Sequence, residues 1–391
     1  MKKITLKDKK DASLRRFHPW VFSGAVADMD APPADGEVVE VYARNGTYLA
    51  TGHYQQSSIC VRIFSFVPTD AGQAFWTQKM QQAHYFRKKI GLPEQPKTNC
   101  YRLVHAEGDG LPGLIVDIYN GVAVLQCHSI GMHLERAKLT QALLEVCPQL
   151  EAVFDKSAET LPEQYARTMQ NGYLYGSAAP RQVLENGHTF LVNWETGQKT
   201  GFFLDQRDNR QLLERYVAGK SVLNAFCYSG GFSIYALRAG ARMVHSVDVS
   251  QKAIELTMQN VALNAPFEGH HKAYAQDVLH FLQKTEQTYE VMVVDPPAFA
   301  KNIAKRHNAV QGYKRLNALA IKKISAGGIL FTFSCSQAVD RQLFYDTIVA
   351  AALEAGRQIR VIHHLNQPAD HPVSLFHPEG AYLKGLVLFV T

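Results

Sequence analysis

The feature that most constrains the fold is an alternation of strand-like and helix-like segments from about residue 219 to the C-terminus. Apolar, β-branched runs lie at 221–226, 243–249, 272–275, 291–294, 328–333, 358–363 and 385–390, and helical spacing lies at 231–237, 251–263 and 341–355. This order is typical of a doubly wound parallel α/β sheet of the Rossmann type. Its seven strands are one more than the usual dinucleotide-binding order has. Because ligands of such sheets bind beyond the carboxyl ends of the strands, the residues after each strand are the first candidates for a site.

The N-terminal half lacks this alternation and divides into two smaller predicted domains. Residues 36–66 contain short β-rich runs around an Asn-Gly turn at 45–46, a strong hairpin signal, so residues 1–72 are expected to form a small β-barrel. Residues 73–192 contain a second Asn-Gly hairpin, a helix at 132–146 and strands near 152–154 and 189–192. We expect an α+β domain of the order strand-strand-helix-strand-strand there, and the α/β domain at 193–391.

Composition limits the class of protein. The chain has 391 residues, of which 46% are hydrophobic and 19% charged, as in a globular protein of two or three domains. It has no apolar run of about 18 residues and no apolar stretch after its first basic residues, so we expect a cytoplasmic protein with no signal peptide and no membrane contact. Its six cysteines are scattered and form no C-x-x-C pair, so neither a disulfide framework nor a metal site is expected.

Positive charge is concentrated in two segments. Residues 1–27 carry a net charge of +5 and residues 298–334 carry +7, whereas the whole chain is only +6. Two basic segments on an otherwise acidic protein indicate a polyanionic partner such as RNA, because phosphate contacts supply sequence-independent affinity. Two solvated basic faces are the alternative. The residues predicted to contact RNA are Arg15, Arg16, Lys301, Lys305, Arg306, Lys314 and Arg315.

The residues after the first three strands of the α/β domain indicate an adenosyl site. Residues 224–232 (NAFCYSGGF) have glycines that let the backbone approach a ligand, but they lack the G-x-G-x-x-G spacing of a pyrophosphate cofactor such as NAD. Asp248 follows the second strand, where an acid can accept both ribose hydroxyls. Asp277 follows the third, where it can accept the adenine amino group. Either Asp alone could be a helix cap, but together the three features resemble the site of S-adenosylmethionine (SAM) methyltransferases.

The residue run after the fourth strand is Asp-Pro-Pro-Ala-Phe at 295–299. Proline continues neither a strand nor a helix, so this run predicts a rigid loop that holds the Asp295 carboxylate. Such D/N-P-P-x-F/Y loops are typical of methyltransferases that act on a planar nitrogen or on a base. A plain turn is the weaker interpretation.

Cys335 follows the fifth strand. A methyltransferase that acts on carbon 5 of a pyrimidine must first add a thiolate to carbon 6. The basic segment before Cys335 and the helix predicted after it are expected to favour the ionised thiol. The alternative is that Cys335 is a small buried packing residue, as most cysteines are. The cysteines expected to serve only in packing are Cys60, Cys127, Cys147 and Cys227.

Taken together, these motifs resemble the PUA-domain-containing cytosine-5 methyltransferases of bacterial 23S ribosomal RNA. Further matching stretches are 16–25 (RFHPWVFSGA), 108–113 (GDGLPG), 199–208 (KTGFFLDQRD) and 382–385 (YLKG), so the resemblance covers essentially the whole chain. It implies a PUA-like β-barrel, a linking α+β domain and a class I SAM methyltransferase domain, with Cys335 at the nucleophile position. Ala298 stands where many related RNA enzymes have a second cysteine, so the group that removes the carbon-5 proton stays open.

The resemblance also implies which residues bind SAM. Residues 203–207 are expected at the methionine end of the cofactor, beside the loop at 224–230. On spacing alone, residues 199–210 could equally begin a charged surface helix. The full predicted set is Phe203, Asp205, Gln206, Arg207, Asn224, Phe226, Ser229, Gly230, Asp248, Asp277 and Asp295.

The sequence therefore predicts SAM-dependent methylation of cytosine carbon 5 in 23S rRNA. The target base would be flipped out of its stack, with Cys335 as nucleophile and Asp295 orienting the base. The alternatives are methylation of a ring or exocyclic nitrogen, methylation of uracil carbon 5, and a non-catalytic, SAM-binding RNA assembly factor. The expected partner is 23S rRNA, naked or in an assembled subunit, with no metal, and a homodimer stays open.

Overall fold

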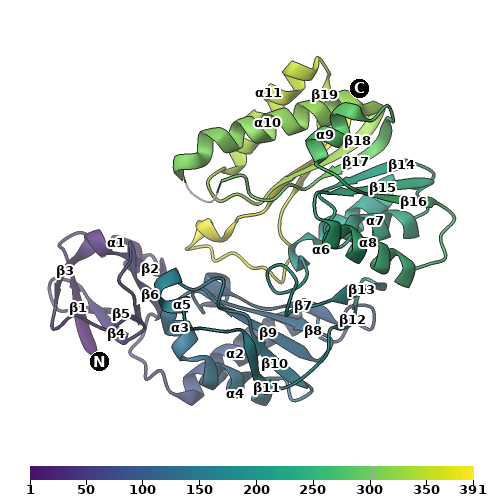
Figure 1. The fold of residues 1–391 in the computed structure, drawn as a ribbon. Coiled ribbons are helices and arrows are strands. Elements are labelled where there is room, and N and C mark those ends of the chain that lie inside the picture. The colour runs from purple at the N-terminus through teal and green to yellow at the C-terminus, as the bar shows by residue number, and fades with distance from the viewer. Residues whose placement is uncertain (301–302) are drawn as a thin grey trace. The chain divides into compact units, whose positions relative to one another are not determined.

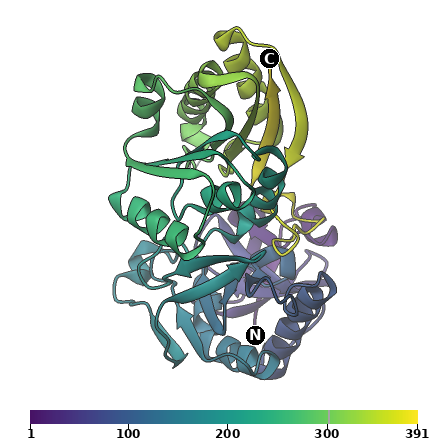
Figure 2. The same cartoon turned by 90° about the vertical axis from the view of Figure 1, so that its right-hand side faces the viewer.

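The computed structural model describes residues 1–300 and 303–391, which form two compact units (Figures 1 and 2). The first unit consists of residues 1–183, 192–204 and 369–380, and the second of residues 184–191, 205–368 and 381–391. The segment 369–380 thus belongs to the first unit although it connects two strands of the second in sequence. The predicted domain boundaries at residues 72 and 192 stay predictions.

The first unit begins with a six-stranded sheet in the order β2-β6-β5-β4-β1-β3. In β4, Val39 and Val41 are buried while their neighbours are partly exposed, the pattern of a strand with one core-facing side. Antiparallel pairing of β4 with β5 confirms the hairpin predicted at 45–46. The elements are β1 (Lys2–Leu6), α1 (Ala12–Arg15), β2 (Trp20–Phe22), β3 (Val26–Met29), β4 (Val38–Tyr42), β5 (Tyr48–Tyr54) and β6 (Ile59–Ser65).

A five-stranded sheet follows in the order β11-β10-β9-β8-β7. Asn120 and Gly121 both have positive φ, as a type I′ turn requires, and they join β8 to β9 in the predicted hairpin. Trp76 and Met80 of α2 are fully buried in the core of this layer. The elements are α2 (Gln73–Lys89), β7 (Cys100–His105), β8 (Leu114–Tyr119), β9 (Val122–Cys127), α3 (Ile130–Leu134), α4 (Arg136–Val146), β10 (Ala152–Asp155), α5 (Glu163–Ala166) and β11 (Gly172–Gly176).

The strand predicted at 189–192 forms as β13 (His188–Val192), but it has a different partner from the one expected. It pairs with β12 (Arg181–Glu185) in a two-stranded sheet, and β11 occupies the edge of the five-stranded sheet instead. Within the second unit, the backbone N–H groups of Thr189 and Leu191 donate to the side chains of Asn264 and Asn260. These amide side chains replace a neighbouring strand, which local periodicity does not reveal.

The second unit is built on a seven-stranded sheet in the order β16-β15-β14-β17-β18-β20-β19. The strands are β14 (Ser221–Ala225), β15 (Met243–Asp248), β16 (His270–Ala275), β17 (Tyr289–Val294), β18 (Ile324–Ser334), β19 (Ile359–Leu365) and β20 (Lys384–Val390). Neighbours from β16 to β18 are parallel, as predicted, but β20 runs antiparallel to both β18 and β19. The expectation of a wholly parallel sheet is therefore wrong at β20, because strand order and direction are not encoded in apolar spacing.

Helices lie on both faces of this sheet (Figures 1 and 2). One core contains Leu213 at the end of α6 and Phe232 of α7, and the other contains Leu316 of α10 and Phe344 of α11. The helices are α6 (Arg207–Leu213), α7 (Gly231–Arg238), α8 (Gln251–Leu263), α9 (Val278–Lys284), α10 (Arg306–Lys323) and α11 (Arg341–Ala355). Among the described residues, no helix is long and apolar enough to cross a membrane.

The chain order reverses at the centre of the sheet, where β14 lies between β15 and β17. The carboxyl ends of strands at such a reversal are where open α/β sheets bind ligands. The loop at 226–230 follows β14 and the loop at 295–299 follows β17, so both predicted motifs start from this point.

Candidate active site

The loop after β14 winds tightly before α7. Phe226, Tyr228 and Gly230 all have positive φ, a conformation that costs a non-glycine residue free energy. A Cβ on Gly230 would lie 2.8 Å from Cγ2 of Thr257, so only glycine fits there without a shift. The buried Ser229 is held through its carbonyl, which accepts a 2.9 Å hydrogen bond from Asn260 Nδ2. The loop is therefore a rigid, closely packed turn.

Asn224 lies on β14 directly below this loop and is buried. Its Nδ2 donates to Oγ of Ser233 at 2.8 Å, and Ser233 in turn bonds Ser246 at 2.7 Å. This bonding fixes the orientation of the amide. Asn224 Oδ1 is buried and accepts no hydrogen bond from the described residues.

Asp248 ends β15, beside the loop after β14. Its Oδ2 accepts from the backbone N–H of Tyr228 at 3.1 Å, and its Oδ1 accepts from the N–H of Ser250 at 2.9 Å. A carboxylate oxygen has more than one lone pair, so each oxygen can still accept a ligand hydroxyl. Asp248 thus holds the loop in place and can still accept the two ribose hydroxyls, as the sequence predicts.

Asp277 follows β16 and caps α9, where its Oδ1 accepts from the N–H of His280 at 2.9 Å. This is the capping role that competed with ligand binding in the sequence analysis. Binding of an adenine amino group by its other oxygen stays a prediction.

Asp295 follows β17 and is held by the segment that begins α6. Gln206 Nε2 donates to Asp295 Oδ2 at 3.0 Å, while Asn209 Nδ2 donates to Gln206 Oε1 at 2.7 Å. The Asn209 bond fixes which end of the Gln206 amide faces the carboxyl. Burial, and then the negative charge of Asp205, raise the pKa of Asp295 to about 7. The carboxyl is therefore about half protonated near neutral pH.

Asp205 is fixed by a residue far away in sequence. Tyr382, just before β20, donates its hydroxyl to Asp205 Oδ2 at 2.7 Å. The other oxygen, Oδ1, is buried and accepts no hydrogen bond from the described residues. Asp205 thus presents an unused acceptor next to Asp295.

Cys335 follows β18 and is half-buried. Burial, and then the charges of Asp295 and Asp205, raise the pKa of its thiol to about 12. The expectation that the basic segment 298–334 favours the thiolate is therefore wrong for the protein alone. Five cations of that segment, Arg306, Lys314, Arg315, Lys322 and Lys323, lie along α10, and Lys314 pairs with Glu354 at 2.9 Å. The groups that act most strongly on Cys335 are instead two acids.

Lys384 is the cation that acts on Cys335. It begins β20 opposite Ser334 and donates its Nζ to the carbonyl of Ser336 at 2.8 Å. Its charge lowers the pKa of Cys335, and burial lowers its own pKa to about 8. In the sequence, this lysine was noted only as part of the 382–385 stretch. The sequence signal that could have identified Lys384 is a lysine at the start of an otherwise apolar strand.

Comparison with known families identifies both parts of the chain. Residues 4–66 match the PUA-like domain family, and residues 104–388 match the S-adenosylmethionine-dependent methyltransferase family. The chain belongs to this methyltransferase family. A relative named ribosomal RNA large subunit methyltransferase I, from Klebsiella pneumoniae (strain 342), is 39% identical over 98% of this chain and 97% of its own length. The protein of the same name from Shewanella amazonensis is 40% identical over 98% of each chain.

Solved structures agree with this methyltransferase fold. A Streptococcus mutans protein described as a candidate SAM-dependent methyltransferase has a TM-score of 0.85 at 23% identity over 100% of both chains. SMU.776, described as a candidate methyltransferase complexed with SAH, has a TM-score of 0.86 at 23% identity over the same range. At this identity the likeness supports the fold.

SAM is the cofactor of this methyltransferase, and the residues around β14 fit it. Asn224 and Asp205 each present a buried acceptor that no described residue uses, which suits the ammonium group of a methionyl moiety. The Gly230 turn leaves room for close approach to the backbone, and Asp248 has lone pairs for a ribose. The roles of the individual residues in binding SAM stay predictions.

Three other members of the predicted SAM set lie in different surroundings. Phe226 is half-buried at the start of the loop. Arg207 begins α6, with its Nε 3.8 Å from Oε2 of the buried Glu185. Phe203 lies in the segment 192–204 of the first unit, so its predicted place beside the cofactor stays a prediction.

The cations predicted to contact RNA are not equivalent. Arg15 and Arg16 are both exposed, and Arg15 pairs with Asp11 at 2.7 Å. In the second unit Lys305, Arg306 and Arg315 are exposed near or on α10. Lys301 lies outside the described residues. The exposed cations are therefore the stronger candidates for phosphate contacts.

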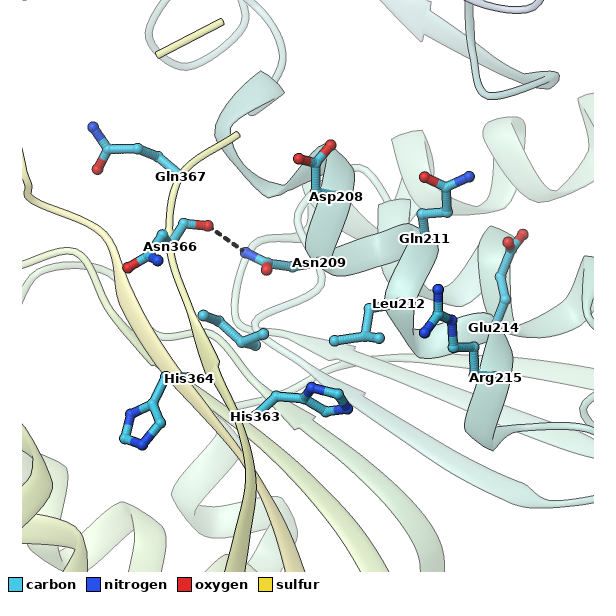
Figure 3. Close-up of a pocket in the computed structure, with 11 residues that line it drawn as sticks. Asp208, Asn209, Gln211, Leu212, Glu214, Arg215, His363, His364, Asn366 and Gln367 are labelled. Atoms are coloured by element: carbon cyan, nitrogen blue, oxygen red, sulfur yellow. Dashed lines mark hydrogen bonds between the residues drawn. The ribbon is translucent and has the colours of Figure 1, made fainter. Parts of the chain in front are cut away.

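A pocket of about 770 Å³ lies between α6 and the end of β19 (Figure 3). Asn209 Nδ2 donates to the carbonyl of Asn366 at 3.3 Å, the bond drawn in Figure 3. Neither Cys335 nor Asp295 lines this pocket. The candidate active site is therefore identified by the polar residues around Asp295 and Cys335, and not by this pocket.

Proposed function

We propose that this chain methylates carbon 5 of a cytosine in large-subunit ribosomal RNA, with Cys335 as nucleophile and Asp295 as the group that binds the base. The observation that carries the proposal is the electrostatic coupling of these two residues. They follow neighbouring parallel strands, β17 and β18, and the charge of Asp295 raises the pKa of the Cys335 thiol. A flipped base that contacts one of them thereby acts on the other.

Ribosomal RNA as substrate is supported by two independent features. The relatives that match 98% of this chain are named ribosomal RNA large subunit methyltransferase I. The chain also exposes Arg16 at its PUA-like part and Arg306 and Arg315 on α10, which suit phosphate groups.

The protonation of Asp295 favours cytosine over uracil. A carboxyl with a pKa of about 7 keeps a proton available near neutral pH and can donate it in a hydrogen bond. Nitrogen 3 of cytosine is an acceptor, whereas nitrogen 3 of uracil carries a hydrogen. The protonated carboxyl can donate its O–H to nitrogen 3 of cytosine while its other oxygen accepts from the cytosine amino group. Uracil would require the two oxygens to exchange these roles, and Gln206, which donates to Oδ2, favours the proton on Oδ1.

Binding of cytosine to Asp295 also prepares the nucleophile. When the Asp295 proton is held in a hydrogen bond to the base, the carboxyl is neutral and no longer opposes ionisation of Cys335. The positive charge of Lys384 then acts against only one acid, Asp205. The pKa of the thiol is thus expected to fall when the substrate arrives.

The covalent step then follows from the position of Cys335. Its thiolate forms the bond from Sγ to carbon 6 of the base, and the electron pair of the 5,6 double bond moves to carbon 5. SAM, when bound, supplies the methyl group that carbon 5 takes up. Loss of the carbon-5 proton to a base returns the electron pair to the double bond and breaks the Sγ–carbon 6 bond, which frees Cys335.

The test compares the protein with its Cys335→Ala variant on unmodified 23S rRNA and labelled SAM, followed by digestion and identification of the nucleoside. We expect 5-methylcytosine with the native protein, none with the variant, and unchanged SAM binding in both. Cys147→Ala is the matched control, since Cys147 is buried in the first unit.

A methylated purine, or an active Cys335→Ala variant, would replace the proposal by methylation of a nitrogen, for which the Asp295 loop is sufficient. 5-Methyluridine would keep the thiolate and overturn the choice of base. Binding of SAM and RNA without any transfer would indicate an assembly factor.

A further inference from the structure

Two copies of the tripeptide Phe-His-Pro, at 17–19 and 376–378, meet in the first unit although they lie at opposite ends of the chain. The rings of Phe17 and Phe376 are 5.3 Å apart, and the rings of His18 and His377 are 5.4 Å apart. Phe17 has a φ of 60°, a strained conformation for a phenylalanine. The chain is thus held in an unfavourable backbone conformation where the two histidines face each other.

A third residue with a metal-binding atom completes the cluster. Oε1 of Glu379 lies 3.5 Å from Nε2 of His18, and its Oε2 lies 3.7 Å from Nε2 of His377. One ligand atom from each residue can be chosen so that all three lie within 4.8 Å of one another. In a tetrahedral zinc site with bonds of about 2.0–2.1 Å, ligand atoms are about 3.3 Å apart. The cluster therefore needs only small side-chain movements to bind a zinc-sized ion.

A second, independent observation comes from His377. Its side chain is 4% exposed, yet neither Nδ1 nor Nε2 makes a hydrogen bond to any residue in 1–300 or 303–391. A buried imidazole without hydrogen bonds is costly, and an ion is one of the partners that can compensate for this cost. His377 also packs against Trp20, with ring centroids 4.4 Å apart, which limits where its nitrogens can point.

The surroundings of the cluster favour a cation. The Trp20 indole N–H donates to Glu107 Oε1 at 2.9 Å, so a second carboxylate lies beside the histidines. Glu379 is half exposed, which leaves an open side for entry of an ion and for a water ligand. One cost opposes binding: His18 Nδ1 accepts a long, 3.3 Å bond from the N–H of Trp20, and this bond is lost when Nε2 binds a metal and the ring proton sits on Nδ1.

We propose that His18, His377 and Glu379 form a binding site for one divalent transition-metal ion of the zinc type. The ion would join the loop before β2 in the PUA-like domain to the segment 369–380. No metal was expected from the sequence, because His18 and His377 lie far apart along the chain and the cysteines form no C-x-x-C pair. The proposal does not depend on which base is methylated, or on whether methylation occurs.

The test uses the full chain without an affinity tag, stripped of metal by a chelator and then titrated with Zn²⁺ and, separately, Co²⁺. We expect one equivalent of Zn²⁺ to bind, and Co²⁺ to give the visible absorption of a four-coordinate N/O site. His377→Gln and Glu379→Gln are each expected to weaken Zn²⁺ binding at least tenfold. The matched controls are His280→Gln, on exposed α9, and Glu94→Gln, on the surface of the first unit.

Thermal unfolding with and without Zn²⁺ distinguishes a variant that has lost the metal site from one that has lost its fold. Zn²⁺ is expected to raise the Tm of the native chain and of both controls, and to leave the Tm of Glu379→Gln unchanged. Glu379 is half exposed, so its replacement is tolerated by the fold. No binding at 100 µM Zn²⁺, or binding that is equal in native protein and both site variants, would overturn the proposal.

Discussion

Gln206 donates a hydrogen bond of 3.0 Å to the Asp295 carboxyl, although 89 residues separate the two in sequence. This bond lowers the pKa of Asp295, while burial and Asp205 raise it by more. The result, a pKa of about 7, is a balance between an amide that stabilises the charged form and surroundings that oppose it. Gln206 therefore changes how much of the Asp295 carboxyl is protonated near neutral pH, and the proposed recognition of cytosine depends on that proton.

The raised pKa of Asp295 predicts how stability depends on pH. The folded state holds this proton up to about pH 7, whereas the unfolded chain releases it near pH 4, so this group makes the free energy of unfolding fall between these values. Asp295→Asn removes the effect. At pH 8 the variant is expected to be more stable than the native protein by about 4 kcal/mol, which corresponds to three pKa units, with little difference at pH 4.

Urea unfolding of both proteins at pH 4.5, 6 and 8 measures this difference. The same variant is expected to lose methylation, because an amide can donate a hydrogen bond to nitrogen 3 but cannot transfer a proton to it when the thiolate adds to the ring. If the native protein and the variant depend on pH in the same way, Asp295 has an ordinary pKa and the argument for cytosine fails with it.

Lys384 provides a second prediction, on activity. Lys384→Met removes the cation that lowers the pKa of Cys335, so less thiolate forms and the rate is expected to fall. A fall of about tenfold would correspond to a rise of one unit in the pKa of the thiol. The pH at which activity reaches half its maximum is expected to move upward. Lys384→Arg keeps the charge and is expected to recover part of the rate.

Single-turnover rates between pH 6 and 9 measure this effect, and SAM binding by each variant reports on folding. Lys323→Met is the matched control, because Lys323 likewise donates to a backbone carbonyl, that of Thr285. A slower Lys384→Met variant with an unchanged pH profile would assign Lys384 a purely structural role through Ser336.

The sequence located the candidate site because of one topological rule. Asp248, Asp295 and Cys335 were each recognised as the residue after a strand, and parallel strands bring such residues to one edge of a sheet. Apolar runs mark strands reliably, so this part of the prediction needed no knowledge of the strand order. The glycine loop was found in the same way.

The sequence could not place β20, and the error in the Cys335 environment follows from this. Lys384 pairs with Ser334 only because β20 enters antiparallel beside β18. The basic residues of 298–334 are close to Cys335 in sequence, but those from Arg306 to Lys323 belong to α10, an 18-residue helix that was not recognised from the sequence. Charge along the chain was therefore a poor guide to charge around the thiol.

Gly230 provides a third prediction, which separates a steric effect from a backbone effect. Gly230→Ala puts a Cβ 2.8 Å from Cγ2 of Thr257 at a φ of 76°. Gly240 has a similar φ of 82°, but its Cβ would meet no atom within 4 Å. Gly240→Ala is thus expected to cost about 1 kcal/mol for the backbone alone, and Gly230→Ala about 2–3 kcal/mol because of the added overlap.

Both variants are measured by urea unfolding and by calorimetric titration with SAM. Only Gly230→Ala is expected to weaken SAM binding, by at least tenfold, because only Gly230 lies in the loop that follows β14. Equal losses of SAM affinity in the two variants would show that the loop is not the cofactor site.

The last prediction concerns the buried pair that anchors α6, the helix that follows Gln206. Arg210 donates two hydrogen bonds to Glu185, at 2.8 and 2.7 Å, and the hydroxyl of Tyr235 donates to the same carboxylate at 3.0 Å. The side chains of Glu185 and Arg210 are 0% and 3% exposed. Glu185→Gln leaves the Arg210 charge buried without its partner, so we expect the free energy of unfolding to fall by about 3 kcal/mol.

Glu94→Gln, which removes an exposed pair with Lys88, is the control and is expected to change the free energy of unfolding by less than about 0.5 kcal/mol. Urea unfolding at pH 7 measures both values, and similar losses in the two variants would show that the buried pair contributes no more than a surface one.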